Sequence, residues 1–172
     1  MTALPHVFEP SGPVPAPPAG RTWEGLMDMA LALARKGASA GETPVGALLA
    51  GPEGHVLAQA HNAPIRLHDP TAHAEILALR AAGARLHNYR LNNCTLIVTL
   101  EPCPMCAAAL VHARVGGLVF GAADAQAGAV ISRAEYLDVP FCNHKVWHMG
   151  GIRAQACADL LRDFFAARRA AG

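Results

Sequence analysis

The sequence has no long apolar run and almost no excess of charge of either sign. The longest continuous apolar candidate, Leu96–Leu100, is short and contains Thr99, whereas a membrane-spanning helix needs about 18 apolar residues in succession. No membrane association is therefore expected. Lys and Arg number 14 against 13 Asp and Glu, which leaves a formal net charge of +1. Contact with a nucleic acid would have to rest on local patches of charge.

The cysteines are few and odd in number. There are five of them, and the first 20 residues carry six prolines but no basic stretch followed by an apolar one. A secretory signal needs both of those stretches, and an odd cysteine count without a signal argues against a disulfide framework. We therefore expect reduced cysteines and a cytoplasmic protein.

The composition is typical of one globular domain. A length of 172 residues corresponds to about one domain, and 52% hydrophobic with 16% charged residues excludes a wholly disordered chain. Residues 1–21 are rich in Pro, Gly and Ala and are predicted to form a flexible leader, because proline removes backbone donors and cannot continue a helix. The folded domain is predicted to comprise residues 22–172.

Hydrophobic periodicity predicts alternating strands and helices. Strands are predicted over 44–50, 55–60, 95–100, 117–120 and 145–149, and helices from Thr22 to Gly37, from Asp69 to Gly83, from Glu101 through Val111 and over 152–169. Residues 124–144 show no readable pattern. The nearly continuous apolar run 95–100 favours a central strand, and the order strand, helix, strand over 95–120 favours a parallel pair. The pattern predicts an α/β domain with one mixed sheet covered by helices on both faces.

Two short motifs carry candidate metal ligands. His73 and the pair Cys103 and Cys106 each lie near the predicted start of a helix. The spacing of three places both sulfurs on one helix face, and sulfur together with imidazole favours zinc. Three protein ligands leave one tetrahedral position to water, as in catalytic zinc sites. We therefore predict one catalytic Zn²⁺ per chain.

Glu75 is the acidic side chain of the first motif. On an ideal helix it lies roughly 200° from His73, which makes it a poor fourth ligand. Zinc with two thiolates and one imidazole has about zero net charge, so it should acidify water less than a three-histidine site, and a carboxylate base is then needed. Glu75 is predicted to carry the proton. His-x-Glu followed by Pro-Cys-x-x-Cys is the signature of zinc deaminases.

A closed structural zinc site is an alternative from a different class of function. Cys142 or His144 could supply a fourth ligand, which would give a zinc-stapled interaction module without activity. A filled fourth position and unfolding on zinc loss would favour it. Glu75 argues against it, because a purely structural site has no evident use for that carboxylate.

The motifs lie within a longer resemblance to a known family. Residues 68–121 contain Asp-Pro-Thr-Ala-His-Ala-Glu-Ile, Asn-Tyr-Arg-Leu, Thr-Leu-Glu-Pro-Cys-Pro-Met-Cys and Val-Phe-Gly. The chain resembles bacterial tRNA-specific adenosine deaminases of the cytidine deaminase-like superfamily over about residues 22–169. The resemblance implies a three-layer α/β/α fold, a homodimer, and hydrolytic deamination of adenosine to inosine at the wobble position of a tRNA anticodon stem-loop. A zinc-bound hydroxide would attack C6 of the base while Glu75 moves the proton.

The resemblance also implies substrate contacts. Asn62 and the Pro44–Val45 segment would bind the flipped base, Asp124 would lie near the ribose and backbone of neighbouring nucleotides, and Phe165 would stack on the RNA loop. Taken alone, Asn62 also fits a turn residue and Asp124 a solvated loop carboxylate. Phe164 lies on the apolar stripe of the last predicted helix, so Phe165 is the better stacking candidate.

The zinc motif alone does not select the substrate. Related deaminases that act on free guanine, cytosine or nucleosides share it. The wider match, above all residues 88–91 and 163–165, favours tRNA. The chain departs from the family at Ala123, where some relatives carry a basic residue, and it has no lysine-rich tail. Fewer cations imply weaker or more salt-sensitive docking of RNA.

Overall fold

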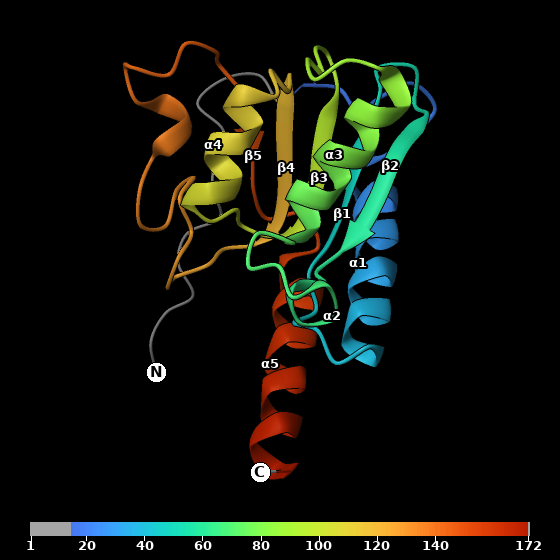
Figure 1. The fold of residues 1–172 in the computed structure, drawn as a ribbon, viewed down its shortest axis with the longest axis vertical. Helices are drawn as coiled ribbons and strands as arrows, with labels where there is room; N and C mark the ends of the chain where they lie inside the picture. The colour runs from blue at the N-terminus through green and yellow to red at the C-terminus, as the bar shows by residue number, and fades with distance from the viewer. Residues whose placement is uncertain (1–14, 172) are drawn as a thin grey trace.

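Five strands form one mixed sheet in the order β2-β1-β3-β4-β5 (Figure 1). The computed structural model describes residues 15–171. β1 pairs antiparallel with β2 and β3, whereas β3 pairs parallel with β4, and β4 with β5. The predicted central strand and the predicted parallel pair are therefore confirmed. The strands are β1 (Gly46–Ala50), β2 (Val56–His61), β3 (Thr95–Leu100), β4 (Gly117–Ala122) and β5 (Trp147–Met149).

Helices cover both faces of this sheet. α1 (Trp23–Ser39) and α5 (Ala154–Ala171) pack on one face, and α3 (Ala74–Leu86) and α4 (Pro104–His112) pack on the other. A short helix α2 (Pro64–Leu67) and one 3-10 turn η1 (Tyr136–Asp138) complete the regular structure of the described residues. The predicted three-layer α/β/α architecture is confirmed, and η1 is the only regular element within the unreadable stretch 124–144.

The central strands contribute side chains to two cores. In β1, Ala47 and Leu49 face the core under α3 and α4, whereas Leu48 and Ala50 face the core under α1 and α5. All four are 0% exposed. β3 and β4 alternate in the same way. Burial on both faces explains why these strands are apolar throughout rather than alternating with polar residues.

One predicted helix cap and one predicted helix start are wrong. The helix expected beside His73 begins at Ala74, but Asp69 does not cap it, because Asp69 Oδ1 accepts hydrogen bonds from the N–H and the hydroxyl of Thr71 and closes a turn instead. The helix predicted from Glu101 begins at Pro104. α3 also continues past its predicted end at Gly83 to Leu86, since one glycine lowers the stability of a helix by only about 1 kcal/mol. These shifts make His73 and Cys103 the N-cap residues of α3 and α4.

The start of α1 agrees with the sequence. Thr22 is its N-cap and accepts a hydrogen bond from Gly25 N–H at 3.1 Å. Of the predicted leader, residues 1–14 lie outside the described residues. Ala19 N–H donates to the Pro52 carbonyl at 3.2 Å, and Arg21 Nε donates to the Gly54 carbonyl at 2.9 Å. Within residues 15–171, none of the helices combines the length and apolar character needed to cross a membrane.

The last helix is anchored at one end only. Cys157 is its one buried residue, packed so close to β4 that a Cβ on Gly121 would lie 2.4 Å from the Cys157 sulfur. Figure 1 shows the C-terminal half of α5 extending away from the rest of the domain. Leu161 and Phe164, which share the predicted apolar stripe with Cys157, are only partly buried.

Candidate functional site

The three predicted zinc ligands converge at the ends of two helices. His73 precedes α3, Cys103 precedes α4 and Cys106 lies in the first turn of α4. In Figure 1 both helices begin at the same lower end of the sheet. This is the end at which the parallel strand β3 finishes, the usual place for a ligand site in α/β domains. Their ligand atoms all lie within 4.8 Å of one another, the one such group among residues 15–171.

The distances fit a tetrahedral zinc ion. His73 Nδ1 lies 3.7 Å from Cys103 Sγ and 3.6 Å from Cys106 Sγ. With Zn–N and Zn–S bonds of about 2.0 and 2.3 Å, tetrahedral ligands stand roughly 3.6 Å apart. The site can therefore take zinc without rearrangement of these side chains.

The two thiols differ in acidity before metal binds. The hydrogen bond from Cys106, assisted by His73, lowers the pKa of Cys103 to about 4. The same hydrogen bond to Cys103 and burial raise the pKa of Cys106. The hydrogen bond to Cys103 also raises the pKa of His73. Zinc binding requires both sulfurs as thiolates, and the divalent cation supplies the positive charge that the pair needs.

Glu75 lies directly beside this group. Its side chain is 4% exposed, and its carboxyl interacts with Cys106 and with His73. Burial raises the pKa of this carboxyl above the ordinary value. The expected angle of roughly 200° from His73 does not apply, because His73 is an N-cap residue with an extended backbone rather than part of the helix. Glu75 is not a member of the metal-ligand group.

Asn62 connects the β2 end to the first ligand. It is 7% exposed, and its Oδ1 accepts a hydrogen bond from Ala74 N–H at 2.8 Å, which caps α3. Its backbone N–H donates to the Val45 carbonyl at 3.0 Å. Pro44 and Val45 are also buried, and Gly46 N–H is held by the Thr99 hydroxyl at 3.1 Å. The structure therefore joins Asn62 to the Pro44–Val45 segment and to the His73 turn.

Asp124 begins the loop after β4. Its Oδ1 accepts hydrogen bonds from Gln126 N–H at 2.9 Å and Ala127 N–H at 3.1 Å, so half of the carboxylate is used within its own turn. Its backbone N–H donates to Glu101 Oε2 at 2.9 Å. Asp124 is therefore an organised loop residue that is tied to the segment preceding Cys103.

Phe165 lies on α5, which carries none of the metal ligands. It is 42% exposed and meets Phe164 edge to face at 5.4 Å between ring centroids. Arg168 stands over the Phe164 ring at 5.3 Å. Of the two rings Phe165 is the more exposed.

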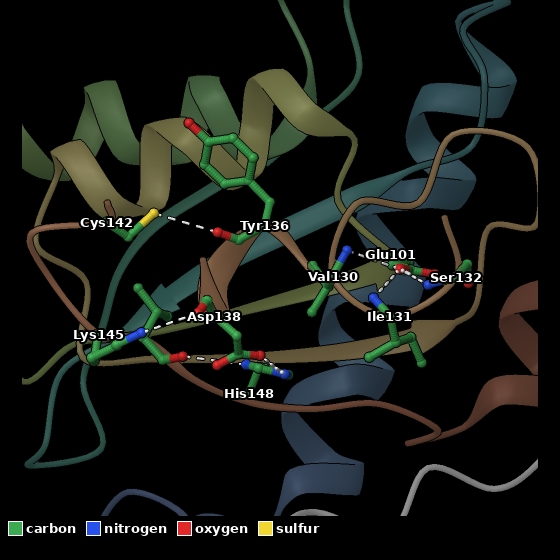
Figure 2. A network of polar contacts seen from close by, with 10 residues as sticks. Glu101, Val130, Ile131, Ser132, Tyr136, Asp138, Cys142, Lys145 and His148 are labelled. Atoms are coloured by element: carbon green, nitrogen blue, oxygen red, sulfur yellow. Dashed lines mark hydrogen bonds and ion pairs between the residues drawn. The ribbon is translucent and has the colours of Figure 1, made fainter. Parts of the chain in front are cut away.

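The alternative zinc ligands have other partners. Cys142 Sγ donates to the Tyr136 carbonyl at 3.4 Å, as Figure 2 shows, and His144 Nε2 is hydrogen bonded to the Val115 carbonyl at 2.7 Å. Neither residue belongs to the metal-ligand group. Within residues 15–171, no fourth protein ligand completes a closed site.

Two buried glutamates at this end of the sheet were not predicted as site residues. Glu42 follows α1 and Glu101 follows β3, and each accepts backbone hydrogen bonds from a distant loop. Burial opposes ionisation of Glu101, but hydrogen bonds from Ser132, Ile131 and Asp124 hold its pKa below the ordinary value. The sequence does contain a signal for Glu101, because a charged residue directly follows the continuous apolar strand 95–100. Glu42 has no comparable signal.

Comparison with known proteins gives concordant results. The model of the cytidine and deoxycytidylate deaminase zinc-binding region matches residues 21–122, which include all three ligands. The chain is 46% identical over 146 residues to the tRNA-specific adenosine deaminase of Haemophilus influenzae, across 85% of this chain and 84% of that one.

Solved structures show the same fold. A structure from work on A-to-I editing by tRNA:A34 deaminases superposes with a TM-score of 0.77 at 40% identity, over 79% of this chain and 98% of that one. Guanine deaminase from Bacillus subtilis superposes with a TM-score of 0.59 at 29% identity, over 87% and 95% of the two chains. The sequence identity is therefore higher to the tRNA deaminases than to this guanine deaminase. His73, Cys103 and Cys106 are the zinc ligands. The chain belongs to the cytidine and deoxycytidylate deaminase zinc-binding family and, within it, to the tRNA-specific adenosine deaminases.

Proposed function

We propose that this protein deaminates adenosine to inosine at the wobble position of a tRNA anticodon loop, with Glu75 as the proton carrier. The observation that carries the proposal is the buried Glu75 carboxyl beside three side chains that fit one zinc ion. The identity of 46% to a tRNA-specific adenosine deaminase supports the choice of substrate. When bound, zinc activates water for attack on C6 of the base.

Glu75 handles the protons of this reaction. It accepts a proton from the attacking water and delivers it to a ring nitrogen of adenine. It then assists the departure of the amino group, so that one water is consumed and one ammonia is released. A carboxyl that is 4% exposed, within reach of the ligands, is suited to this exchange, because no bulk water competes for the proton.

Asn62 orients the base. Its Oδ1 is engaged by Ala74 N–H, so the Nδ2 amide is the group that is left to donate to the substrate. Buried Pro44 and Val45 provide an apolar wall beside it. Asp124 and Phe165 contact the neighbouring nucleotides of the loop, Phe165 by stacking.

One assay separates this function from its alternatives. The zinc-loaded protein is incubated with an anticodon stem-loop that bears a wobble adenosine, and in parallel with free guanine, cytosine and adenosine. We expect inosine in the stem-loop and an equal amount of ammonia. Ammonia from the free compounds alone would assign the chain to the free-base deaminases, and no ammonia from any of them would favour the zinc-stapled module.

We further propose a homodimer formed through the face of α3 and α4. An apolar groove runs between these helices, lined among others by Ile76, Leu79 and Ala109, and the adjacent Tyr89 is 66% exposed. A second copy would cover this surface. Light scattering should give twice the mass of the chain, and Tyr89→Glu should shift the protein toward a monomer. A wild-type monomer at micromolar concentration would contradict this proposal.

The cysteines bear on the compartment. Zinc requires Cys103 and Cys106 as thiolates. We therefore propose that the protein works in the reducing cytoplasm, where thiols stay reduced.

A further inference from the structure

Two buried carboxylates have no part in the proposed proton transfer, yet each holds a loop next to a zinc ligand. Glu42 is 1% exposed and Glu101 is 2% exposed. Buried carboxylates are usually paired with a cation, but neither of these has an ion pair within the described part of the chain. Their charge is instead balanced by groups of N–H donors.

Glu42 holds the loop that leads to the first ligand. Its carboxylate accepts hydrogen bonds from the backbone N–H groups of Ile65, at 3.3 Å, and Arg66, at 2.8 Å. Both belong to the first turn of α2, where N–H groups have no partner inside the helix. The loop begins at Asn62 and ends at His73. Glu42 therefore fixes the segment that joins the proposed base-binding amide to a zinc ligand.

Glu101 holds a second loop against the other ligand turn. It lies two residues before Cys103, and its carboxylate accepts hydrogen bonds from the loop after β4, of which Figure 2 shows Val130, Ile131 and Ser132. The donors are the backbone N–H groups of Asp124 at 2.9 Å, Val130 at 3.1 Å, Ile131 at 2.8 Å and Ser132 at 2.9 Å, together with the Ser132 hydroxyl. The loop that carries Asp124 is thus tied to the segment that carries Cys103.

The approach of this loop leaves no room for a side chain. A Cβ on Gly128 would lie 2.3 Å from Glu101 Oε2. A second tie joins the same two segments, because Ala129 N–H donates to the Pro102 carbonyl at 2.9 Å. Short, charge-assisted hydrogen bonds at a buried position restrain a loop more tightly than apolar contact does.

We propose that Glu42 and Glu101 are positioning residues of the deaminase site. Glu42 sets the Asn62 loop relative to His73, and Glu101 sets the Asp124 loop relative to Cys103. The inference rests on the function proposed above, since it assigns Asn62 to the base and Asp124 to the neighbouring nucleotides. A small misplacement of a substrate-orienting group is enough to slow a reaction by orders of magnitude.

The test compares Glu42→Gln and Glu101→Gln with the wild type on the anticodon stem-loop. Glutamine has the same size, but its NH₂ group would face an N–H donor of the loop, and two donors cannot form a hydrogen bond. Glu53→Gln, at an exposed position in the turn between β1 and β2, is the control for charge. We expect both buried variants to keep one zinc per chain and a cooperative melting curve. kcat/KM should fall at least tenfold in both, through kcat in Glu42→Gln and through KM in Glu101→Gln, whereas Glu53→Gln should stay within twofold of the wild type.

Amide hydrogen exchange provides a readout that is independent of activity. Glu42→Gln should lose protection at Ile65 and Arg66, and Glu101→Gln at Val130, Ile131 and Ser132. Glu42→Asp and Glu101→Asp, which keep the charge but shorten the side chain, should give intermediate exchange and intermediate kcat/KM.

The outcomes are distinguishable. A wild-type protein that fails to deaminate the stem-loop contradicts the proposed function, whereas the exchange measurement still decides whether the carboxylates hold the loops. Zinc-loaded Gln variants with wild-type kcat and KM would overturn the positioning role. Loss of zinc or of the folded state in both the Gln and the Asp variants would overturn it too, in favour of a purely structural one.

Discussion

At the ligand end of the sheet, Glu75, Glu101 and Glu42 are 4%, 2% and 1% exposed, whereas Phe165 on α5 is 42% exposed. The first region is fixed by hydrogen bonds between segments far apart in the chain. The second is a helix that extends away from the body (Figure 1). The reacting centre and the proposed stacking contact on α5 are therefore separable, so that substitutions of Glu75 and of Phe165 should change different kinetic constants.

Removal of zinc should have the largest effect. Cys106→Ser replaces a thiolate ligand and should reduce zinc content well below one per chain and deamination to background, because the site would lose its metal chemistry. Metal analysis and the stem-loop assay measure both. Cys94→Ser, at a buried cysteine outside the site, is the matched control and should retain zinc. Full activity of a zinc-free Cys106→Ser variant would show that the reaction does not require zinc.

Glu75→Gln should come next in size. The amide cannot accept and return a proton, so kcat should fall by about 10²- to 10⁴-fold, whereas zinc content stays at one per chain. Because the effect concerns the reacting centre, it should be the same for every RNA substrate. A zinc-loaded variant with wild-type kcat would remove Glu75 from the mechanism.

The two motifs of the site could be recognised in the sequence because each is local. His73 and Glu75 are two residues apart, Cys103 and Cys106 are three apart, and their helices follow from hydrophobic periodicity. The nearly continuous apolar run 95–100 likewise predicted a central strand that is buried on both faces. The cap of α3 was misplaced because the oxygen that accepts the Ala74 N–H belongs to Asn62, which is 12 residues away. The loops that Glu42 and Glu101 hold could not be predicted from the sequence. The donors lie 23 to 31 residues away, and they are backbone N–H groups, which no particular residue type marks.

Phe165→Ala should have a smaller effect that is confined to the second region. Stacking of a base on an aromatic ring contributes about 1–3 kcal/mol, so KM for the stem-loop should rise by roughly 5- to 150-fold while kcat is retained. Phe164→Leu, which changes the less exposed ring of the pair, is the control and should change KM less. A large fall in kcat with unchanged KM would contradict the separation of the two regions.

Arg169→Ala should have the smallest effect. Arg169 is exposed near the end of α5, and one lost phosphate contact should lower the slope of log affinity against log salt by about 0.7 to 1. Arg85→Ala removes the same charge at the C-terminal end of α3 and should leave the slope unchanged. Fluorescence anisotropy with labelled stem-loop across a salt series measures the slope. Equal slopes in Arg169→Ala and the wild type would exclude Arg169 from the RNA contact.

X-ray absorption at the zinc edge of the zinc-loaded protein reports directly whether one coordination position of the metal is open to solvent. Three ligands from two helix ends predict two sulfur atoms at about 2.3 Å, one imidazole nitrogen and one further light atom from solvent. In Glu75→Gln the same spectrum should be retained. A third sulfur or a second imidazole in the coordination shell would contradict the account, because the protein would then fill the position at which the substrate water must enter.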